Sequence, residues 1–218
     1  MTTFGTETIN CPCCGESFEI QLLTSTNTFG VRTTDLYVGA GGFQPILIVI
    51  ACCPTCGYSS EGYTLREADP VEPAIKEKVF AELKPQVADG VPPPAGQWAF
   101  AAQIAEWRGE PDMAVADTWL RAAWAAAQSA RTPPEQEAAY RRQAITFFQR
   151  ALQADPPPDN ALILTYLVGE LYRRVGHTEQ AEAWFNEAIT MAEHASQPDA
   201  SQIADLARQQ RDAPKETL

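Results

Sequence analysis

Two pentapeptides of nearly the same sequence, Cys-Pro-Cys-Cys-Gly at residues 11–15 and Cys-Pro-Thr-Cys-Gly at residues 53–57, decide how this chain folds. Each has the form C-P-x-C-G, in which the glycine supplies the positive φ of a tight turn, so that both cysteines of one turn point to the same place. Paired C-x-x-C motifs in a reducing compartment favour a metal over disulfides. We therefore expect one structural Zn²⁺ ion in a closed, tetrahedral site. Its expected ligands are Cys11, Cys14, Cys53 and Cys56.

Two further cysteines, Cys13 and Cys52, each lie beside an expected ligand. We expect them to be small residues that happen to be cysteine, and three alternatives stay open: spare ligands, a redox pair tuned by the adjacent metal, or a small disulfide. A thioredoxin-like use of residues 53–56 is a minor alternative. That chemistry needs only one such motif followed by a long helix, whereas this chain has two copies and a strand-like segment follows the second. A catalytic zinc would need an open coordination position, usually beside histidine or carboxylate, and His177 and His194 lie in the other half of the chain.

The chain is acidic, with a formal net charge of −12. A zinc ion held by four thiolates would make this about −14, since +2 − 4 = −2. Residues 1–66 contain two arginines and no lysine against five carboxylates. Binding to a nucleic-acid backbone depends on lysine and arginine, so we expect no nucleic-acid partner. A nucleic-acid-binding ribbon is kept as the last alternative.

The N-terminal residues 1–10 are polar and show neither the basic nor the apolar region of a signal peptide. The longest apolar run, residues 46–53, is far shorter than the roughly 18 residues of a membrane-spanning helix. We therefore expect a cytoplasmic protein that has no membrane partner.

The first part of the sequence predicts a small β module, a zinc ribbon, over residues 1–66. Strands are expected at 7–10 and 18–22, a central strand at 46–51 and a closing strand at 58–65. The 38 residues between the two cysteine motifs are about twice the roughly 15–20 of a simple paired site, so the ribbon must be elaborated.

The rest of the sequence predicts helices, and the fold class is therefore α+β. Residues 67–97 are expected to hold a connecting helix, about 72–83, and a proline-rich linker, 85–97. An all-helical domain is expected over 98–195, and a weak helix with a polar tail over 196–218. The predicted helices cover 98–108, 111–130, 134–154, 159–175 and 178–194, and the weaker one covers about 200–211.

The spacing in one of the predicted helix pairs matches a tetratricopeptide repeat. Gly169, Ala181 and Ala188 are small enough for two helices to approach closely, while Tyr172 and Phe185 fill the space beside them. We expect two and a half to three such repeats, enough for a small solenoid.

In tetratricopeptide repeats the first helix of each pair lines a concave groove. Resemblance to the repeat places four residues there, and we expect this groove to bind a protein or peptide partner. The four residues are Ile163, Tyr166, Glu170 and Arg173.

Other conspicuous residues have plainer interpretations. The five tryptophans occur at helical spacing among alanines, so we expect them to fill the core. The adjacent pairs Arg141–Arg142 and Arg173–Arg174 are expected to lie on solvated helix faces.

Read together, the two cysteine motifs, the segment Ala122–Trp124 and the block 166–176 resemble an uncharacterised bacterial family catalogued as domain of unknown function 2225. The resemblance covers most of residues 7–194. It implies a bacterial cytoplasmic protein with a metal-binding head and a repeat-like tail, and it implies no reaction. The glycine-rich residues 39–42 and the proline-rich linkers depart from the family pattern.

The sequence contains no nucleophile elbow, phosphate loop, Rossmann fingerprint or metalloprotease motif. We therefore expect a non-enzymatic adaptor or scaffold. The alternative from another class is a thiol- or metal-responsive regulator with Cys13 or Cys52 as its sensor. The sequence leaves open whether a partner or the chain's own tail occupies the helical groove.

Overall fold

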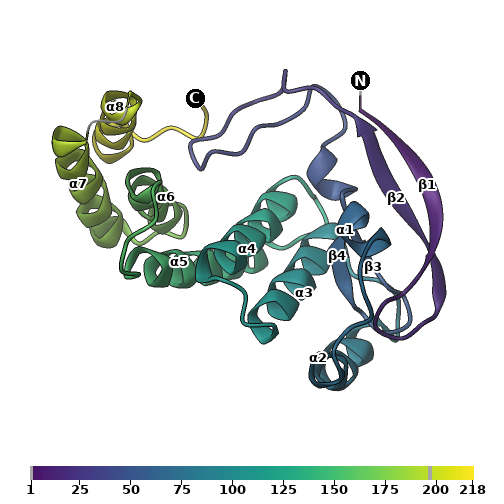
Figure 1. Cartoon of the computed structure of the whole chain (residues 1–218). Helices are drawn as coiled ribbons and strands as arrows, with labels where there is room; N and C mark the ends of the chain where they lie inside the picture. The colour runs from purple at the N-terminus through teal and green to yellow at the C-terminus, as the bar shows by residue number, and fades with distance from the viewer. Residues whose placement is uncertain (1, 196–197) are drawn as a thin grey trace.

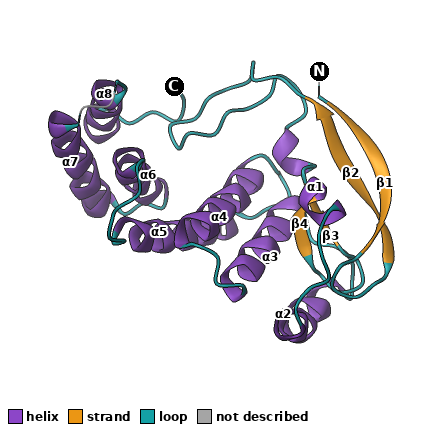
Figure 2. Cartoon of the chain, viewed as in Figure 1, coloured by secondary structure: helices purple, strands orange, loops and turns teal. Residues whose placement is uncertain are grey.

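The computed structural model describes residues 2–195 and 198–218, with the strands in the first third of the chain (Figure 1). Two small two-stranded sheets are followed by a mostly helical domain, so the predicted α+β fold class is confirmed (Figure 2). The first part contains β1 (Thr3–Asn10), β2 (Ser17–Ser25), the 3₁₀ helix η1 (Pro45–Leu47), β3 (Ile50–Cys52), β4 (Ser59–Glu61) and α1 (Gly62–Arg66). The connecting part contains α2 (Pro73–Lys78), the π-helical turn η2 (Val79–Leu83) and the 3₁₀ helix η3 (Lys84–Val87). The helical part contains α3 (Pro94–Trp107), α4 (Asp112–Ala127), α5 (Pro134–Leu152), α6 (Ala161–Arg174), α7 (Thr178–His194) and α8 (Ala200–Asp212).

The hairpin of β1 and β2 contains the strands predicted at 7–10 and 18–22, and the first cysteine motif forms its turn. The strands pair antiparallel, with Ile9 opposite Phe18. Ile20 and Leu22 are buried against the core, while Glu19 and Gln21 are exposed, as expected for a strand with one solvated face. Most of β1 is exposed, so the hairpin covers the core with a single strand.

Two strand predictions are wrong over most of their length. Residues 46 and 47 of the predicted central strand, 46–51, belong to η1, and only its residues 50 and 51 belong to β3. Pro45 begins η1 because its ring presets φ and it has no N–H to give to a sheet. The apolar run is explained by burial, since Ile46 packs in the helical core and its carbonyl accepts from Trp98 Nε1 at 2.9 Å. A continuous apolar run does not distinguish a strand from another buried segment.

The predicted closing strand, residues 58–65, is also mostly wrong. Only Ser59–Glu61 pair with β3, and the chain then turns into α1. Gly62 stands at this change because a side chain there would meet Gln21 O at 2.9 Å and Leu22 Cδ2 at 3.0 Å. The close approach of β2 therefore ends the strand.

The predicted helices correspond to α3 to α8, and the connecting helix corresponds to α2 with η2. α3 begins at Pro94, inside the predicted linker, because proline suits the first turn of a helix, where its missing N–H is not needed. No helix of residues 2–195 and 198–218 is long and apolar enough to cross a membrane.

Helix α3 joins the β part to the helical part. Trp98 and Ala102 belong to the core of the helices, whereas Phe100 and Ile104 belong to the core around the cysteines. Hydrophobic contacts thus continue across the boundary predicted at residues 97/98. The domain limits remain predictions, and the one predicted at 195/196 falls at residues 196–197, outside the described residues.

The tryptophans lie in or against these cores, in line with their interpretation as core residues. Trp98 is 2% exposed and Trp119 is 6% exposed. Trp107 packs against the cysteine core, and Trp124 and Trp184 pack against the helical core.

A long loop between β2 and η1 leaves the sheets and runs along the helices (Figure 1). Helices α3 to α8 follow a curve, and the loop and the C-terminal end of the chain lie together on its inner side. Tyr37 holds the loop against the helices. The centroid of its ring lies 5.5 Å from that of the Trp124 ring, and its side chain belongs to the helical core. The long spacer between the cysteine motifs is therefore used to reach across the helical domain.

We expect Gly169→Ala to lower the free energy of unfolding, although alanine is the better helix former by about 1 kcal/mol. An added Cβ would lie 2.9 Å from Cδ1 and 3.0 Å from Cε1 of Phe185. That ring is 1% exposed and has no space to move aside, and overpacking of a core costs about 1–3 kcal/mol. Urea denaturation measures the change. A double variant with Phe185→Leu should recover part of the loss, and unchanged stability of Gly169→Ala would contradict the packing described.

Candidate functional site

The two cysteine motifs form turns of the same geometry. In each turn the glycine N–H donates to the carbonyl of the first cysteine at 2.9 Å, from Gly15 to Cys11 and from Gly57 to Cys53. The N–H of that first cysteine donates in turn to the carbonyl five residues later, again at 2.9 Å in both turns. The glycines have φ values of +84° and +80°, which L-residues with a side chain rarely adopt. Glycine is therefore required at both positions, as the sequence predicted.

The two turns bring four sulfur atoms together. The Sγ atoms of the four expected ligands all lie within 4.8 Å of one another. Cys11 Sγ is 3.7 Å from Cys56 Sγ, and Cys14 Sγ is 3.6 Å from Cys53 Sγ. Four sulfurs at about 2.3 Å from a tetrahedral metal would be separated by about 3.8 Å, whereas a disulfide requires about 2.0 Å. The six cysteines are free thiols, and the four have the spacing of a metal site.

The close approach of the four sulfurs shifts the pKa values of the thiols in opposite directions. The nearby Cys53 raises the pKa of Cys11, whereas Cys11 and Cys56 lower the pKa of Cys53. A metal binds thiolates and not thiols, so metal binding would release protons and the affinity for a divalent cation would fall as the pH falls.

The cluster is tied to its surroundings on two sides. Pro12 accepts a hydrogen bond from the N–H of Val71 at 3.0 Å. Tyr58, directly after the second turn, is 2% exposed and its hydroxyl accepts from Arg108 Nη2 at 2.6 Å. Because Arg108 follows α3, the second turn is bonded directly to the helical part.

Cys13 and Cys52 do not belong to the cluster of four. They are 3% and 7% exposed. Burial raises the pKa of Cys52 to about 11, so this thiol is neutral at pH 7 and a poor nucleophile. A hydrogen bond with Cys56 lowers the pKa of Cys13, but its burial keeps it from solvent. A role for either as a reactive thiol stays a prediction.

The four residues predicted to line the groove all lie on α6. Tyr166 and Glu170 are fully buried, whereas Ile163 and Arg173 are partly exposed. The long loop contacts two of them: Tyr166 Oη donates to the carbonyl of Thr34 at 2.7 Å, and Thr34 Oγ1 donates to Glu170 Oε1 at 2.5 Å. The sequence left open what occupies the groove, and in the structure the chain's own loop lies at these two residues.

The loop places one buried carboxylate, that of Asp35, among the helices. Its Oδ2 accepts from Arg141 Nη1 at 2.6 Å and from Trp124 Nε1 at 3.1 Å. Arg174 Nη2 lies 3.6 Å from its Oδ1. Burial acts to raise the pKa of Asp35, but Arg141 and Arg174 outweigh it and the pKa is lowered. The interaction therefore requires the charged carboxylate.

The expectation of a solvated face for the arginine pairs is wrong for Arg141, which is 2% exposed. Arg142 is exposed as predicted, and Arg173 and Arg174 are partly buried. Sequence reasoning missed Asp35 as well, because an acid in a turn-rich segment gives no sign of a partner 106 residues away. The one usable sign was the length of the spacer between the cysteine motifs.

The C-terminal tail completes the groove. Glu216 forms ion pairs with Arg173 at 2.9 Å and with Arg174 at 2.8 Å. Thr217 forms an antiparallel bridge with Thr33, and the N–H of Leu218 donates to Arg32 O at 2.9 Å. Both the loop and the tail of the chain therefore lie in the groove, which answers the question that the sequence left open.

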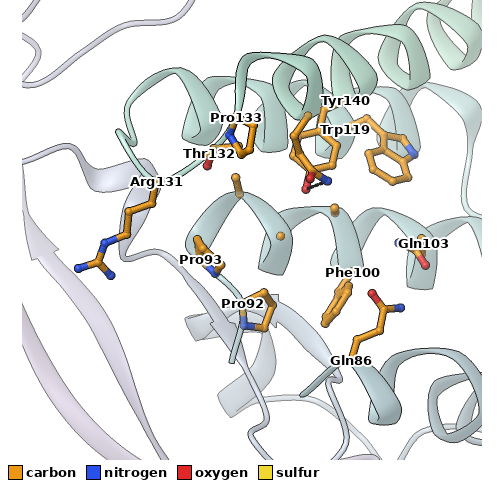
Figure 3. A pocket seen from close by; sticks show the side chains of 14 residues that line it. Gln86, Pro92, Pro93, Phe100, Gln103, Trp119, Arg131, Thr132, Pro133 and Tyr140 are labelled. Carbon is orange, nitrogen blue, oxygen red and sulfur yellow. Dashed lines mark hydrogen bonds between the residues drawn. The ribbon is translucent and has the colours of Figure 1, made fainter. Parts of the chain in front are cut away.

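A separate cavity of about 360 Å³ lies beside α3 (Figure 3). In Figure 3, Trp119, Tyr140 and Thr132 lie on one side of the α3 ribbon and Phe100 on the other, while Arg131 points away. Trp119 Nε1 and Thr132 Oγ1 are buried without a hydrogen-bond partner among the described residues. The lining contains no Asp, Glu, His, Cys or Lys, so it presents no acid–base pair.

We expect the purified protein to contain one zinc ion per chain and Cys56→Ser to abolish metal retention, because the serine hydroxyl is a much poorer ligand than a thiolate. Cys52→Ser is the matched control, since Cys52 is also buried and lies four residues away but does not belong to the cluster of four. Elemental analysis and counting of reactive thiols measure both. Equal metal content in the two variants would contradict the four-cysteine site, as would ready reaction of all six thiols without a chelator.

We expect Asp35→Asn to lower the free energy of unfolding at pH 7 by about 3 kcal/mol, since it leaves the buried Arg141 without a charged partner in the loop. The pKa of Asp35 is lowered by folding, so its contribution is present above about pH 4, the unfolded value, and is lost as the pH falls through the lower folded value. Denaturant titrations should therefore show the difference from wild type shrinking below pH 4. Asp117→Asn, at an exposed ion pair with Arg121, should cost less than about 1 kcal/mol, and an equal cost would contradict the network.

Comparison with known proteins agrees with the resemblance seen in the sequence. No curated protein matches the chain, and no solved structure matches it. The family described as "Uncharacterized protein conserved in bacteria (DUF2225)" matches residues 4–213, which include both cysteine motifs, the long loop and all the helices. The chain belongs to this bacterial family.

Proposed function

We propose that this protein is a non-enzymatic, zinc-containing adaptor that binds an extended segment of a partner protein along the inner side of its curved helical domain. One observation carries the proposal: this surface binds two extended segments of the chain itself, the loop at Thr34 and the tail at Glu216. It contacts the first through a backbone carbonyl and the second through a carboxylate. Both groups occur in any extended acidic peptide.

The proposed zinc ion has a structural role in this account. Four thiolates complete a tetrahedral coordination and leave no position for a reacting water. The two sheets have two strands each, and a two-stranded hairpin is at best marginally stable alone. A metal at the four cysteines would hold both ends of the segment from Cys14 to Cys53. This segment contains the long loop, so the metal would support the part of the chain that lies in the groove.

The charges favour a protein partner over a nucleic acid. Three arginines of the groove are paired with carboxylates of the helices and the loop: Arg141 with Asp35 and Glu137, and Arg173 and Arg174 with Glu170. Their charge is therefore largely balanced, unlike that of the extended basic surface that binds a phosphate backbone. The hidden Cys13 and Cys52 give little support to the thiol sensor.

Site-specific photo-crosslinking in the native bacterium tests the proposal. A photoreactive residue at position 163, on the same face of α6 as Tyr166 and Glu170, or at position 32, beside the tail, should capture a partner protein. The same residue at Gln180, exposed on α7, should not capture it, because α7 packs behind α6. Mass spectrometry of the crosslinked species identifies the segment. Capture from position 180 alone, with none from 163 or 32, would refute binding along the inner side.

A further inference from the structure

The C-terminal tail after α8 is bound in the groove as an added strand. Thr34 N–H donates to Glu216 O at 3.1 Å, and Leu218 N–H donates to Arg32 O at 2.9 Å, on either side of the bridge between Thr33 and Thr217. An extended peptide that adds to a strand edge in this way gains affinity from its backbone and specificity from a few side chains. In the tail the specific side chain is that of Glu216.

Two guanidinium groups recognise this glutamate. Arg173 Nη2 binds Oε1 at 2.9 Å, and Arg174 Nη1 binds Oε2 at 2.8 Å. Arg174 Nη2 also donates to the backbone oxygen of Glu216 at 3.1 Å. Each carboxylate oxygen therefore has its own arginine, an arrangement that suits a carboxylate in one orientation.

The tail and the loop differ in how firmly they are bound. The ion pair of Asp35 with Arg141 is buried, both side chains being 2% exposed. The side chain of Glu216 is 65% exposed, and Leu218 is 61% exposed. Breaking an exposed ion pair costs far less than breaking a buried one. The tail can therefore leave while the loop stays in place.

Departure of the tail would leave a prepared surface. Arg173 and Arg174 would keep their ion pairs with the buried Glu170, at 2.8 and 2.7 Å, so both guanidinium groups would remain held in position. The N–H of Thr34 and the carbonyl of Arg32 would be available to another extended backbone. This surface has the shape and charge of a receptor for a short strand that carries a glutamate.

We propose that the tail occupies the docking site of the partner, and that the partner segment is an extended acidic peptide whose glutamate replaces Glu216 between Arg173 and Arg174. This inference rests on the proposed adaptor function and gives the partner its chemistry. The peptide runs antiparallel to residues 32–34. Side chains beside its glutamate contribute little, because those of Lys215 and Leu218 in the tail are exposed.

Binding of the tail in trans tests this proposal. The chain ending at Ala213 keeps the whole of α8 and lacks only the tail. We expect it to bind a fluorescent peptide of residues 213–218, measured by anisotropy, and to bind the same peptide carrying Glu216→Gln at least about tenfold more weakly. A peptide carrying Lys215→Gln is the matched control and should bind like the natural one. Raising the salt concentration should weaken binding, since the ion pairs are exposed.

The full-length protein should bind the peptide at least about tenfold more weakly than the shortened chain, because its own tail competes at an effective concentration on the order of millimolar. Glu216→Gln in the full-length chain should restore binding. If the shortened chain is folded and metal-loaded but binds no peptide at millimolar concentration, or binds the Glu216→Gln peptide equally well, the proposal is wrong. Capture of a partner from positions 32 and 163 would then still support the adaptor function, with a partner of different chemistry.

Discussion

The structure depends on the convergence of four cysteine sulfurs from two turns that lie 38 residues apart in the sequence. Each turn is internally hydrogen-bonded through a left-handed glycine, so the direction of each pair of thiols is set locally. The convergence then holds both ends of the intervening segment at one point. A long segment fixed at both ends loses much of the entropy that would otherwise oppose its ordering, and its middle can lie in a defined place on the helices.

That middle carries one carboxylate into a site where two arginines meet it. A buried Asp35 without Arg141, or a buried Arg141 without Asp35, would leave a charge without compensation in a poorly solvated environment. The loop and the helices therefore depend on each other, because the buried Arg141 has its charged partner Asp35 only when the loop is docked. In this region the chain itself covers the inner side of the helices. The ion pair of the loop, between Asp35 and Arg141, is buried, whereas the side chain of Glu216 in the tail is 65% exposed.

Several elements were predictable from local sequence. The glycine of each C-P-x-C-G motif, the alternation of β2 and the breaks between α3 to α8 are properties of short segments, and the structure agrees with each of them. The failures occurred where a segment was shaped by a distant neighbour. The start of the apolar run after Pro45 packs against Trp98 and does not pair in a sheet, and the segment after Glu61 turns into a helix at Gly62, where β2 lies close. A run of hydrophobic residues indicates that a segment is buried. It does not indicate whether the segment pairs in a sheet or packs against helices.

The sequence by itself determined the four thiols, the α+β class and the order of the helices, because turn chemistry and helical periodicity act over a few residues. It also drew attention to Tyr166 and Glu170, through their predicted positions in a repeat. Only the tertiary structure decided what those residues contact. The pairing of Asp35 with Arg141 and of Glu216 with Arg173 and Arg174 joins positions 42 to 106 residues apart, and no local pattern encodes such a pair. The physical reason is that ionic contacts depend on where charged groups meet in space, and that is settled when the two cysteine turns close the loop and the helices stack beneath it.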